Sequence, residues 1–236
     1  MVDQLLPTTV RRVVLLNPKG GSGKSTLATN LAACYAASGL QTVLMDYDPQ
    51  ASSWRWLKTR PGALAPIHGI AAYERPAGVT RSFHLRLPPG TARVVVDTPA
   101  ALEPAEIAEF SRDADAILVP VLPSPIDIRA CARCIEHLLT TAKVKRRESR
   151  LAVVANRVRP NTLVFHSLIR FLGTLDIPLV ATLRESQNYI RAAETGIGLH
   201  EMQPERSHPD VAQWAPLVAW VESRGMPASK GVEASA

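Results

Sequence analysis

One ten-residue segment limits the possible folds of this chain more than any other. Residues 17–26 read Asn-Pro-Lys-Gly-Gly-Ser-Gly-Lys-Ser-Thr, after an apolar, β-branched run at residues 10–16 and before a helical pattern at residues 24–38. Glycines at such a strand-to-helix turn let successive backbone N–H groups point at an anion, and the helix N-terminus adds partial positive charge. The sequence therefore predicts a phosphate-binding loop in an α/β fold.

The side chains of this loop suit a nucleotide and Mg²⁺. Lys24 can reach the β- and γ-phosphates, and the Ser25 hydroxyl can ligate the metal. The general pattern G-x-x-x-x-G-K-[ST] places glycine where this chain has Pro18, so the match is to the variant K-G-G-x-G-K-[ST], which carries an extra lysine, Lys19. The expected nucleotide-binding residues of the loop are Gly20, Gly21, Ser22, Gly23, Lys24, Ser25 and Thr26.

Short β-branched runs alternate with longer helical patterns along the chain, as is typical of a parallel sheet wrapped by helices. Residues 13–16 and 94–96 are apolar at successive positions, so both faces of the sheet should be covered. We expect a single-domain α/β P-loop NTPase with a mostly parallel twisted sheet and helices on both faces, spanning residues 1–224, and a disordered tail at residues 225–236. The expected strands are residues 10–16, 41–46, 92–97, 116–119, 151–156 and 179–183. The expected helices are residues 24–38, 104–111, 126–141, 163–172, 188–195 and 211–224, and residues 54–89 are expected to form an elaborated surface connection.

Composition excludes several classes of protein. The chain is 46% hydrophobic and 20% charged, which is typical of a globular protein and not of a disordered one. It has no apolar stretch long enough to cross a membrane and no basic, apolar leader, so we expect a cytoplasmic protein. Three cysteines cannot pair completely and fit a reducing compartment. The net charge of +6 favours a polyanionic partner.

Two further motifs follow the loop, each at the end of an expected strand. Residues 46–50 read Asp-Tyr-Asp-Pro-Gln, and residues 94–97 read Val-Val-Val-Asp. Together with the loop, they resemble the deviant Walker-A ATPases of the ParA/MinD family, over residues 10 to about 201. The resemblance implies ATP hydrolysis, ATP and Mg²⁺ as cofactors, and an ATP-bound sandwich homodimer. Lys19 has no evident task beside Lys24 in its own site, and the resemblance implies that it crosses to the nucleotide of the partner.

The carboxylates are expected to have separate roles. An aspartate at the carboxyl end of a strand beside a phosphate loop can hold the waters around Mg²⁺, which suits Asp97. By resemblance, Asp48 orients the attacking water and Asp46 supports the metal shell or the loop, so the expected catalytic residues are Lys19, Lys24 and Asp48, and the expected metal residues are Ser25, Asp97 and Asp46. The family also places an asparagine where this chain has Asn156, to pair with adenine; without the resemblance, a turn-initiating role would be favoured.

Three functional classes share this resemblance. The favoured class is a positioning ATPase: its ATP dimer binds non-specific nucleoid DNA, and a ParB-like or cargo-adaptor protein stimulates hydrolysis and release. Such a cycle distributes a plasmid, a chromosome or a protein cargo such as carboxysomes. A MinD-type membrane ATPase needs a C-terminal amphipathic helix, which residues 226–233 do not encode. An iron–sulfur scaffold ATPase would use Cys131 and Cys134, but their spacing in a helix favours burial in the core.

Two basic patches are candidates for contact with DNA. Residues 141–160 hold seven lysines and arginines, Arg146 and Arg147 among them, against one glutamate. The family places DNA-contacting arginines just after the last core strand, which favours Arg184 and then Arg191. These two would share a helix face if the helix began early enough. We therefore expect Arg184 and Arg191 to be the principal contacts and Arg146 and Arg147 to be auxiliary.

Overall fold

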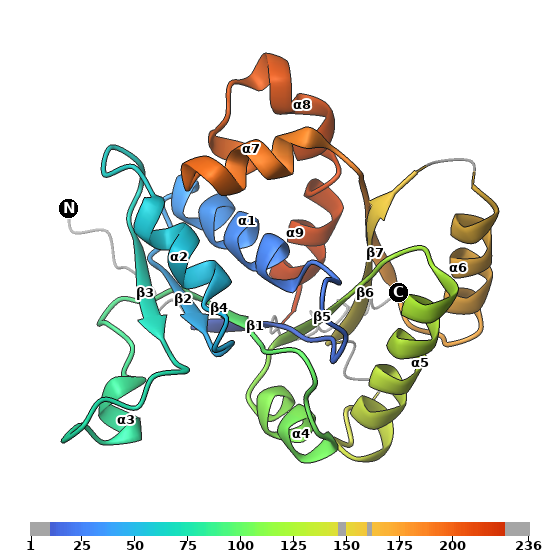
Figure 1. The fold of residues 1–236 in the computed structure, drawn as a ribbon, viewed down its shortest axis with the longest axis horizontal. Coiled ribbons are helices and arrows are strands. Elements are labelled where there is room, and N and C mark those ends of the chain that lie inside the picture. Colours follow the sequence, from blue (N-terminus) through green and yellow to red (C-terminus); the bar gives the residue numbers. More distant parts are fainter. Residues whose placement is uncertain (1–9, 146–149, 160–161, 225–236) are drawn as a thin grey trace, which may run out of the picture.

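A parallel sheet forms the centre of the computed structural model, which describes residues 10–145, 150–159 and 162–224 (Figure 1). Within these residues the sheet has seven strands in the order β3-β2-β4-β1-β5-β6-β7, and every neighbouring pair is parallel. The strands are β1 (Arg11–Leu15), β2 (Thr42–Asp46), β3 (Ile67–Ala71), β4 (Arg93–Asp97), β5 (Ala116–Val121), β6 (Leu151–Val158) and β7 (Leu179–Arg184). The α/β fold with a parallel sheet is therefore confirmed.

Helices cover both faces of this sheet (Figure 1). One face carries α4 (Pro104–Arg112), α5 (Pro125–Thr140) and α6 (Leu163–Gly173), and the other carries α1 (Lys24–Ala37), α2 (Ser52–Thr59), α7 (Gln187–Thr195) and α9 (Ala215–Glu222). The 3₁₀ turn η2 (Leu199–Glu201) and α8 (Pro204–Ala212) follow α7. Successive residues of β1 alternate between the two cores: Val14 packs on the α4–α6 side, and Val13 and Leu15 pack on the α1 side. This alternation explains why residues 13–15 of the strand are apolar at successive positions.

The topology brings the polar strand ends to one edge. β1 lies between β4 and β5, so the strand order reverses at β1. In α/β sheets, ligands usually bind at the carboxyl ends of the strands beside such a reversal. Leu15 of β1 and Asp46 of β2 are both register partners of Asp97 in β4. The loop after β1 therefore starts beside both carboxylates.

Two segments differ from the sequence-based expectation. Residues 54–89 contain most of α2, the edge strand β3 and the short helix α3 (Arg81–His84), and not only a surface connection. β3 was missed because Gly69 interrupts its β-branched pattern; a Cβ at Gly69 would lie 2.3 Å from Leu57 Cδ2 of α2, so close packing requires the glycine. The expected helix 211–224 is two helices, α8 and α9, because Pro216 lacks an N–H group and starts a new helix. The predicted tail, residues 225–236, lies outside the described residues and stays a prediction.

A buried ion pair fixes α2 against the segment after α7, and it gives a stability prediction. Arg60 pairs with Glu201, with side-chain exposures of 6% and 4%, and Glu201 also accepts a hydrogen bond from the Gly198 N–H at 2.8 Å. We expect Glu201→Ala to lower the free energy of unfolding by about 3 kcal/mol, because the Arg60 charge stays buried without its partner. Urea denaturation measures this loss. Glu185→Ala is the control, because it breaks the exposed pair with Arg159 and should have a much smaller effect; equal losses would contradict the account.

Candidate nucleotide-binding site

The phosphate loop lies between β1 and α1, as expected, and α1 begins at Lys24. Gly21 and Gly23 have φ values of 76° and 98°, in the left-handed region that favours glycine. At Gly23 space is limiting as well, because a Cβ there would lie 2.0 Å from Asn156 Nδ2. The loop therefore depends on glycine for its backbone conformation and for its contact with β6.

The side chain of Lys24 is buried against this loop. Its Nζ donates to the Asn17 carbonyl oxygen at 2.8 Å and to the Lys19 carbonyl oxygen at 3.4 Å. Burial lowers the pKa of Lys24, and Asp97 and Asp48 act in the opposite direction. Asn17 braces the loop, because its side chain donates to the Pro120 carbonyl oxygen and accepts from the Lys19 N–H. The loop thus holds a cation that an anionic ligand would stabilise.

The buried carboxylate of Asp97 lies at the end of β4, beside the phosphate loop. It is fully buried, and neither carboxylate oxygen has a hydrogen-bond partner in the described part of the chain. Burial, with a contribution from Asp46, raises its pKa to about 7, while Ser25, Ser53 and Lys24 act in the opposite direction. Buried oxygens without partners are costly, so this arrangement fits hydrated Mg²⁺. Ser25 and Asp97 are the residues that would hold the metal.

The raised pKa of Asp97 predicts a pH dependence of stability. Between the ordinary value of 3.8 and about 7, the folded protein keeps this proton and the unfolded chain loses it, so the free energy of unfolding falls as pH rises through this interval. Asp97→Asn removes the titration. Its melting temperature without nucleotide should therefore rise relative to wild type as pH increases across the interval. Asp113→Asn, at an exposed position, is the control, and a constant difference between Asp97→Asn and wild type would contradict the prediction.

Asp46 and Asp48 are used differently in the structure. Asp46 is buried, and its two carboxylate oxygens accept the N–H groups of Asp48 at 2.9 Å and Trp54 at 2.8 Å. Of the two roles expected for Asp46, these contacts favour support of the loop over support of the metal shell. Asp48 is partly exposed, and its Oδ1 accepts the Gln50 N–H at 2.9 Å. Ser53, which sequence reasoning missed, is fully buried in α2, and its hydroxyl has no hydrogen-bond partner within the described ranges. Like Ser25, it lowers the pKa of Asp97.

Lys19 has a partner in its own chain that the sequence did not indicate. Its Nζ lies 2.5 Å from Asp127 Oδ1, and the Asp127 side chain is only 5% exposed. Asp127 lies in the first turn of α5, where Ser124 caps the helix and also contacts the carboxylate. Serine followed three residues later by an acidic residue is a helix-start signal, but it does not reveal the lysine partner 108 positions away.

Asn156 contacts the phosphate loop. Its Nδ2 donates to the Ser22 carbonyl oxygen at 3.0 Å, and its Oδ1 accepts the Arg157 N–H at 2.9 Å. Asn156 as a whole is 4% exposed. In this structure Asn156 therefore holds the loop against β6, and adenine recognition stays a prediction.

The candidate DNA arginines do not share one helix. Arg184 is the last residue of β7 and α7 begins at Gln187, so the common helix face considered for Arg184 and Arg191 does not exist. They are instead linked through two residues that the sequence did not indicate. Arg184 Nε lies 2.5 Å from Asp210 Oδ1, Asn188 Nδ2 lies 2.7 Å from Asp210 Oδ2, and Arg191 Nη1 lies 3.5 Å from Asn188 Oδ1. Arg146 and Arg147 lie outside the described residues.

Two cysteines bear on the iron–sulfur class, whereas residues 226–233, on which the membrane class depends, lie outside the described residues. Cys131 and Cys134 lie in α5 and are fully buried in the core, as expected, and burial raises the pKa of the Cys131 thiol to about 12. Among the described residues, no group of three or more His, Cys, Asp or Glu side chains could hold a metal ion. No helix in the described ranges is long and apolar enough to cross a membrane.

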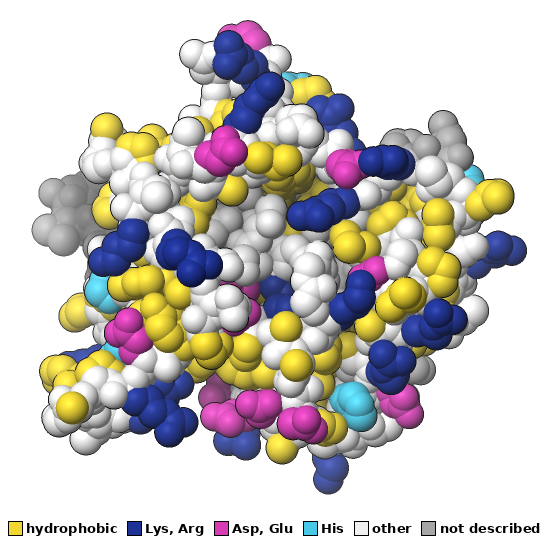
Figure 2. Space-filling model, viewed as in Figure 1, with side chains coloured by type: hydrophobic (Ala, Val, Ile, Leu, Met, Phe, Trp, Pro, Cys, Tyr) yellow, Lys and Arg dark blue, Asp and Glu magenta, His cyan; other side chains and the backbone are white. Residues whose placement is uncertain are grey.

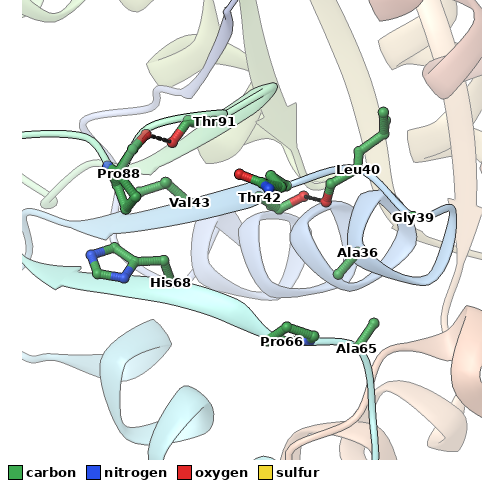
Figure 3. A pocket seen from close by; sticks show the side chains of 11 residues that line it. Ala36, Gly39, Leu40, Thr42, Val43, Ala65, Pro66, His68, Pro88 and Thr91 are labelled. Atoms are coloured by element: carbon green, nitrogen blue, oxygen red, sulfur yellow. Dashed lines mark hydrogen bonds between the residues drawn. The ribbon is translucent and has the colours of Figure 1, made fainter. Parts of the chain in front are cut away.

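A separate pocket lies at the opposite edge of the sheet. It has a volume of about 340 Å³ and is lined by Thr42, Val43, Pro66, His68 and Pro88, among others (Figure 3). Thr42 begins β2 and Pro66 precedes β3, so the pocket lies at the amino ends of these strands. It is not part of the site at the phosphate loop.

The loop, its buried lysine and the carboxylate at the end of β4 define a P-loop nucleotide-binding protein. A family model described as the CobQ/CobB/MinD/ParA nucleotide binding domain matches residues 13–199. The chain therefore belongs to this family, which confirms the resemblance recognised in the sequence.

Two relatives and two solved structures illustrate the match. The chain is 28% identical over 194 residues to the maintenance of carboxysome distribution protein A of Halothiobacillus neapolitanus, covering 80% of this chain and 87% of the relative. It is 35% identical over 135 residues to the chromosome-partitioning ATPase Soj of Thermus thermophilus, covering 54% and 53%. The apo McdA structure from Cyanothece superposes with a TM-score of 0.69 at 18% identity, covering 90% and 98%. A plasmid partition protein of Borrelia burgdorferi bound to AMPPNP superposes with a TM-score of 0.66 at 14% identity, covering 89% and 98%.

Proposed function

We propose that this protein is a Mg²⁺-dependent ATPase that positions a cargo on nucleoid DNA. The observation that carries the proposal is the set of groups around one loop: the buried ammonium of Lys24, the fully buried carboxylate of Asp97 and the accessible carboxylate of Asp48. The names of the relatives, which refer to carboxysome distribution and to chromosome partitioning, support cargo positioning as the use of the ATPase.

Each group has a role that follows from its place. The glycine loop and the N-terminus of α1 bind the phosphates through backbone N–H groups, and Lys24 neutralises them. Ser25 and Asp97 hold Mg²⁺, which, when bound, offsets the charge of the phosphate oxygens. Asp48 orients the attacking water, and the Asp46 carboxylate keeps Asp48 in place by accepting its backbone N–H.

Lys19 acts in the dimer. In the single chain its ammonium is paired with Asp127, so reaching the nucleotide of a second subunit requires this ion pair to open. The phosphate charge of ATP offsets the loss of the carboxylate partner. Dimer formation is therefore expected to depend on the nucleotide.

ATP-dependent DNA binding tests the proposal. We expect the wild-type protein to shift non-specific duplex DNA with ATP and Mg²⁺ and not with ADP. At the proposed surface we choose Arg191→Glu, because Arg191 is exposed on α7 and the change should not disturb the fold. Arg184→Glu would instead place a carboxylate beside the fully buried Asp210. Since the dimer has two copies of Arg191, Arg191→Glu should reduce the slope of log K against log salt by about 2 and leave ATP hydrolysis unchanged.

A matched control uses the exposed arginine of α6. Arg170→Glu makes the same charge change away from α7 and should bind DNA like the wild type. Retained binding by Arg191→Glu, together with lost binding by the double variant Lys143→Glu/Lys145→Glu, would move the DNA surface to the basic segment after α5.

A further inference from the structure

The connection between β3 and β4 forms an arm that extends from the edge of the sheet. The arm comprises residues 73–90 and carries α3 (Figure 1, lower left). No step of the proposed ATPase cycle uses it.

Hydrophobic and basic side chains are exposed together on this arm. Phe83 of α3 is 66% exposed and Val79 is 40% exposed. Arg75 and Arg86 are exposed, and no ion pair joins either to a described residue; the arm has one acidic residue, Glu74. Figure 2 shows yellow and dark blue side chains side by side at the lower left, where the arm lies. An apolar patch with a basic rim is typical of a surface that binds another molecule.

The base of the arm contacts the loop that holds Asp48. Arg81 Nη1 donates to the Ala72 carbonyl oxygen at 2.6 Å, and its guanidinium lies 5.5 Å from the centroid of the Tyr47 ring. Tyr47 stands between Asp46 and Asp48, and its ring packs edge-on against Phe110 of α4, 5.0 Å away. A shift of α3 would therefore act on the backbone between the two aspartates.

We propose that the arm is a docking surface for an acidic protein segment that carries a bulky apolar side chain, and that the Arg81–Tyr47 contact links docking to the Asp48 loop. The second part rests on the proposed function, since it makes the docked segment the stimulator of ATP hydrolysis.

The chemistry of the arm favours a protein segment over nucleic acid. The two unpaired arginines match a short acidic stretch, and they provide few of the phosphate contacts that stable duplex binding requires. The exposed ring of Phe83 and the Val79 side chain gain most from an apolar partner that removes them from water. An acidic segment with one aromatic or aliphatic anchor satisfies both features.

Peptide selection tests the docking surface without knowledge of the natural partner. A random-peptide phage library is panned on the wild-type protein with ATP and Mg²⁺, and a fluorescein-labelled copy of the enriched peptide is titrated by fluorescence anisotropy. We expect enrichment of peptides with excess Asp and Glu and at least one bulky apolar residue. Phe83→Ser and Arg75→Glu should each weaken binding by about 10-fold or more. Ile190→Ser, which changes a 52% exposed residue of α7, and Arg170→Glu are the matched controls and should bind the peptide normally.

Hydrolysis measurements separate docking from coupling. With the same peptide, Arg81→Ala should keep basal ATP hydrolysis and bind the peptide, yet lose stimulation of phosphate release. If the protein hydrolyses no ATP at all, the proposed function fails, while peptide binding at the arm still stands on the anisotropy data. Enrichment of basic peptides, the absence of any binder, unchanged peptide binding by Phe83→Ser, or loss of duplex DNA binding by the arm variants would each overturn the docking proposal. Stimulation that persists in Arg81→Ala would overturn the coupling.

Discussion

Replacing Lys24 by alanine is expected to weaken ATP binding by about 100-fold or more, because the change removes a buried ammonium that would pair with the phosphates. In the structure Lys24 Nζ is held by two loop carbonyl oxygens, so the cation is already positioned and little ordering is needed when ATP binds. Isothermal titration with ATP and Mg²⁺ measures the effect. The fold should survive, since burial without a phosphate disfavours the charged lysine.

A second lysine controls for the loss of positive charge. Lys58 is exposed on α2 and lies over the Trp54 ring, away from the loop. Lys58→Ala should bind ATP like the wild type. Wild-type affinity in Lys24→Ala would remove the phosphate loop from the mechanism.

Asp48→Ala is expected to lower the rate of ATP hydrolysis by about 100-fold or more while ATP affinity changes little. Asp48 is the accessible carboxylate of the pair, and its removal leaves Lys24, Ser25 and Asp97 in place. Phosphate release under saturating ATP gives the rate, and titration gives the affinity. Asp113→Ala, at an exposed position after α4, is the control. Equal rates for Asp48→Ala and wild type would assign water activation to another group.

The sequence predicted the parts of the site that are local. The phosphate loop could be recognised because glycine, lysine and hydroxyl residues must occur at fixed spacing within one turn. The burial of Cys131 and Cys134 followed from their spacing on one helix. The sheet followed from strands such as residues 13–16, which are apolar at every position because both faces are covered.

The parts that the sequence did not predict depend on distant contacts. Asp127 meets Lys19 across 108 positions, and Asp210 meets Arg184 across 26, with no local pattern that pairs them. The edge strand β3 was missed because the glycine that α2 packing requires also weakens the strand signal. Asn156 was expected to face a base, and only the fold places its amide against the loop.

Sedimentation velocity of the Asp48→Ala protein tests the central claim, that ATP joins two subunits through the phosphate loop and Lys19. Because this variant should retain ATP, the account predicts a dimer with ATP and Mg²⁺ and a monomer with ADP and Mg²⁺. Lys19→Ala should be a monomer with either nucleotide. A monomeric Asp48→Ala protein with ATP, together with a dimeric Lys19→Ala protein, would contradict the account and reverse the roles assigned to these two residues.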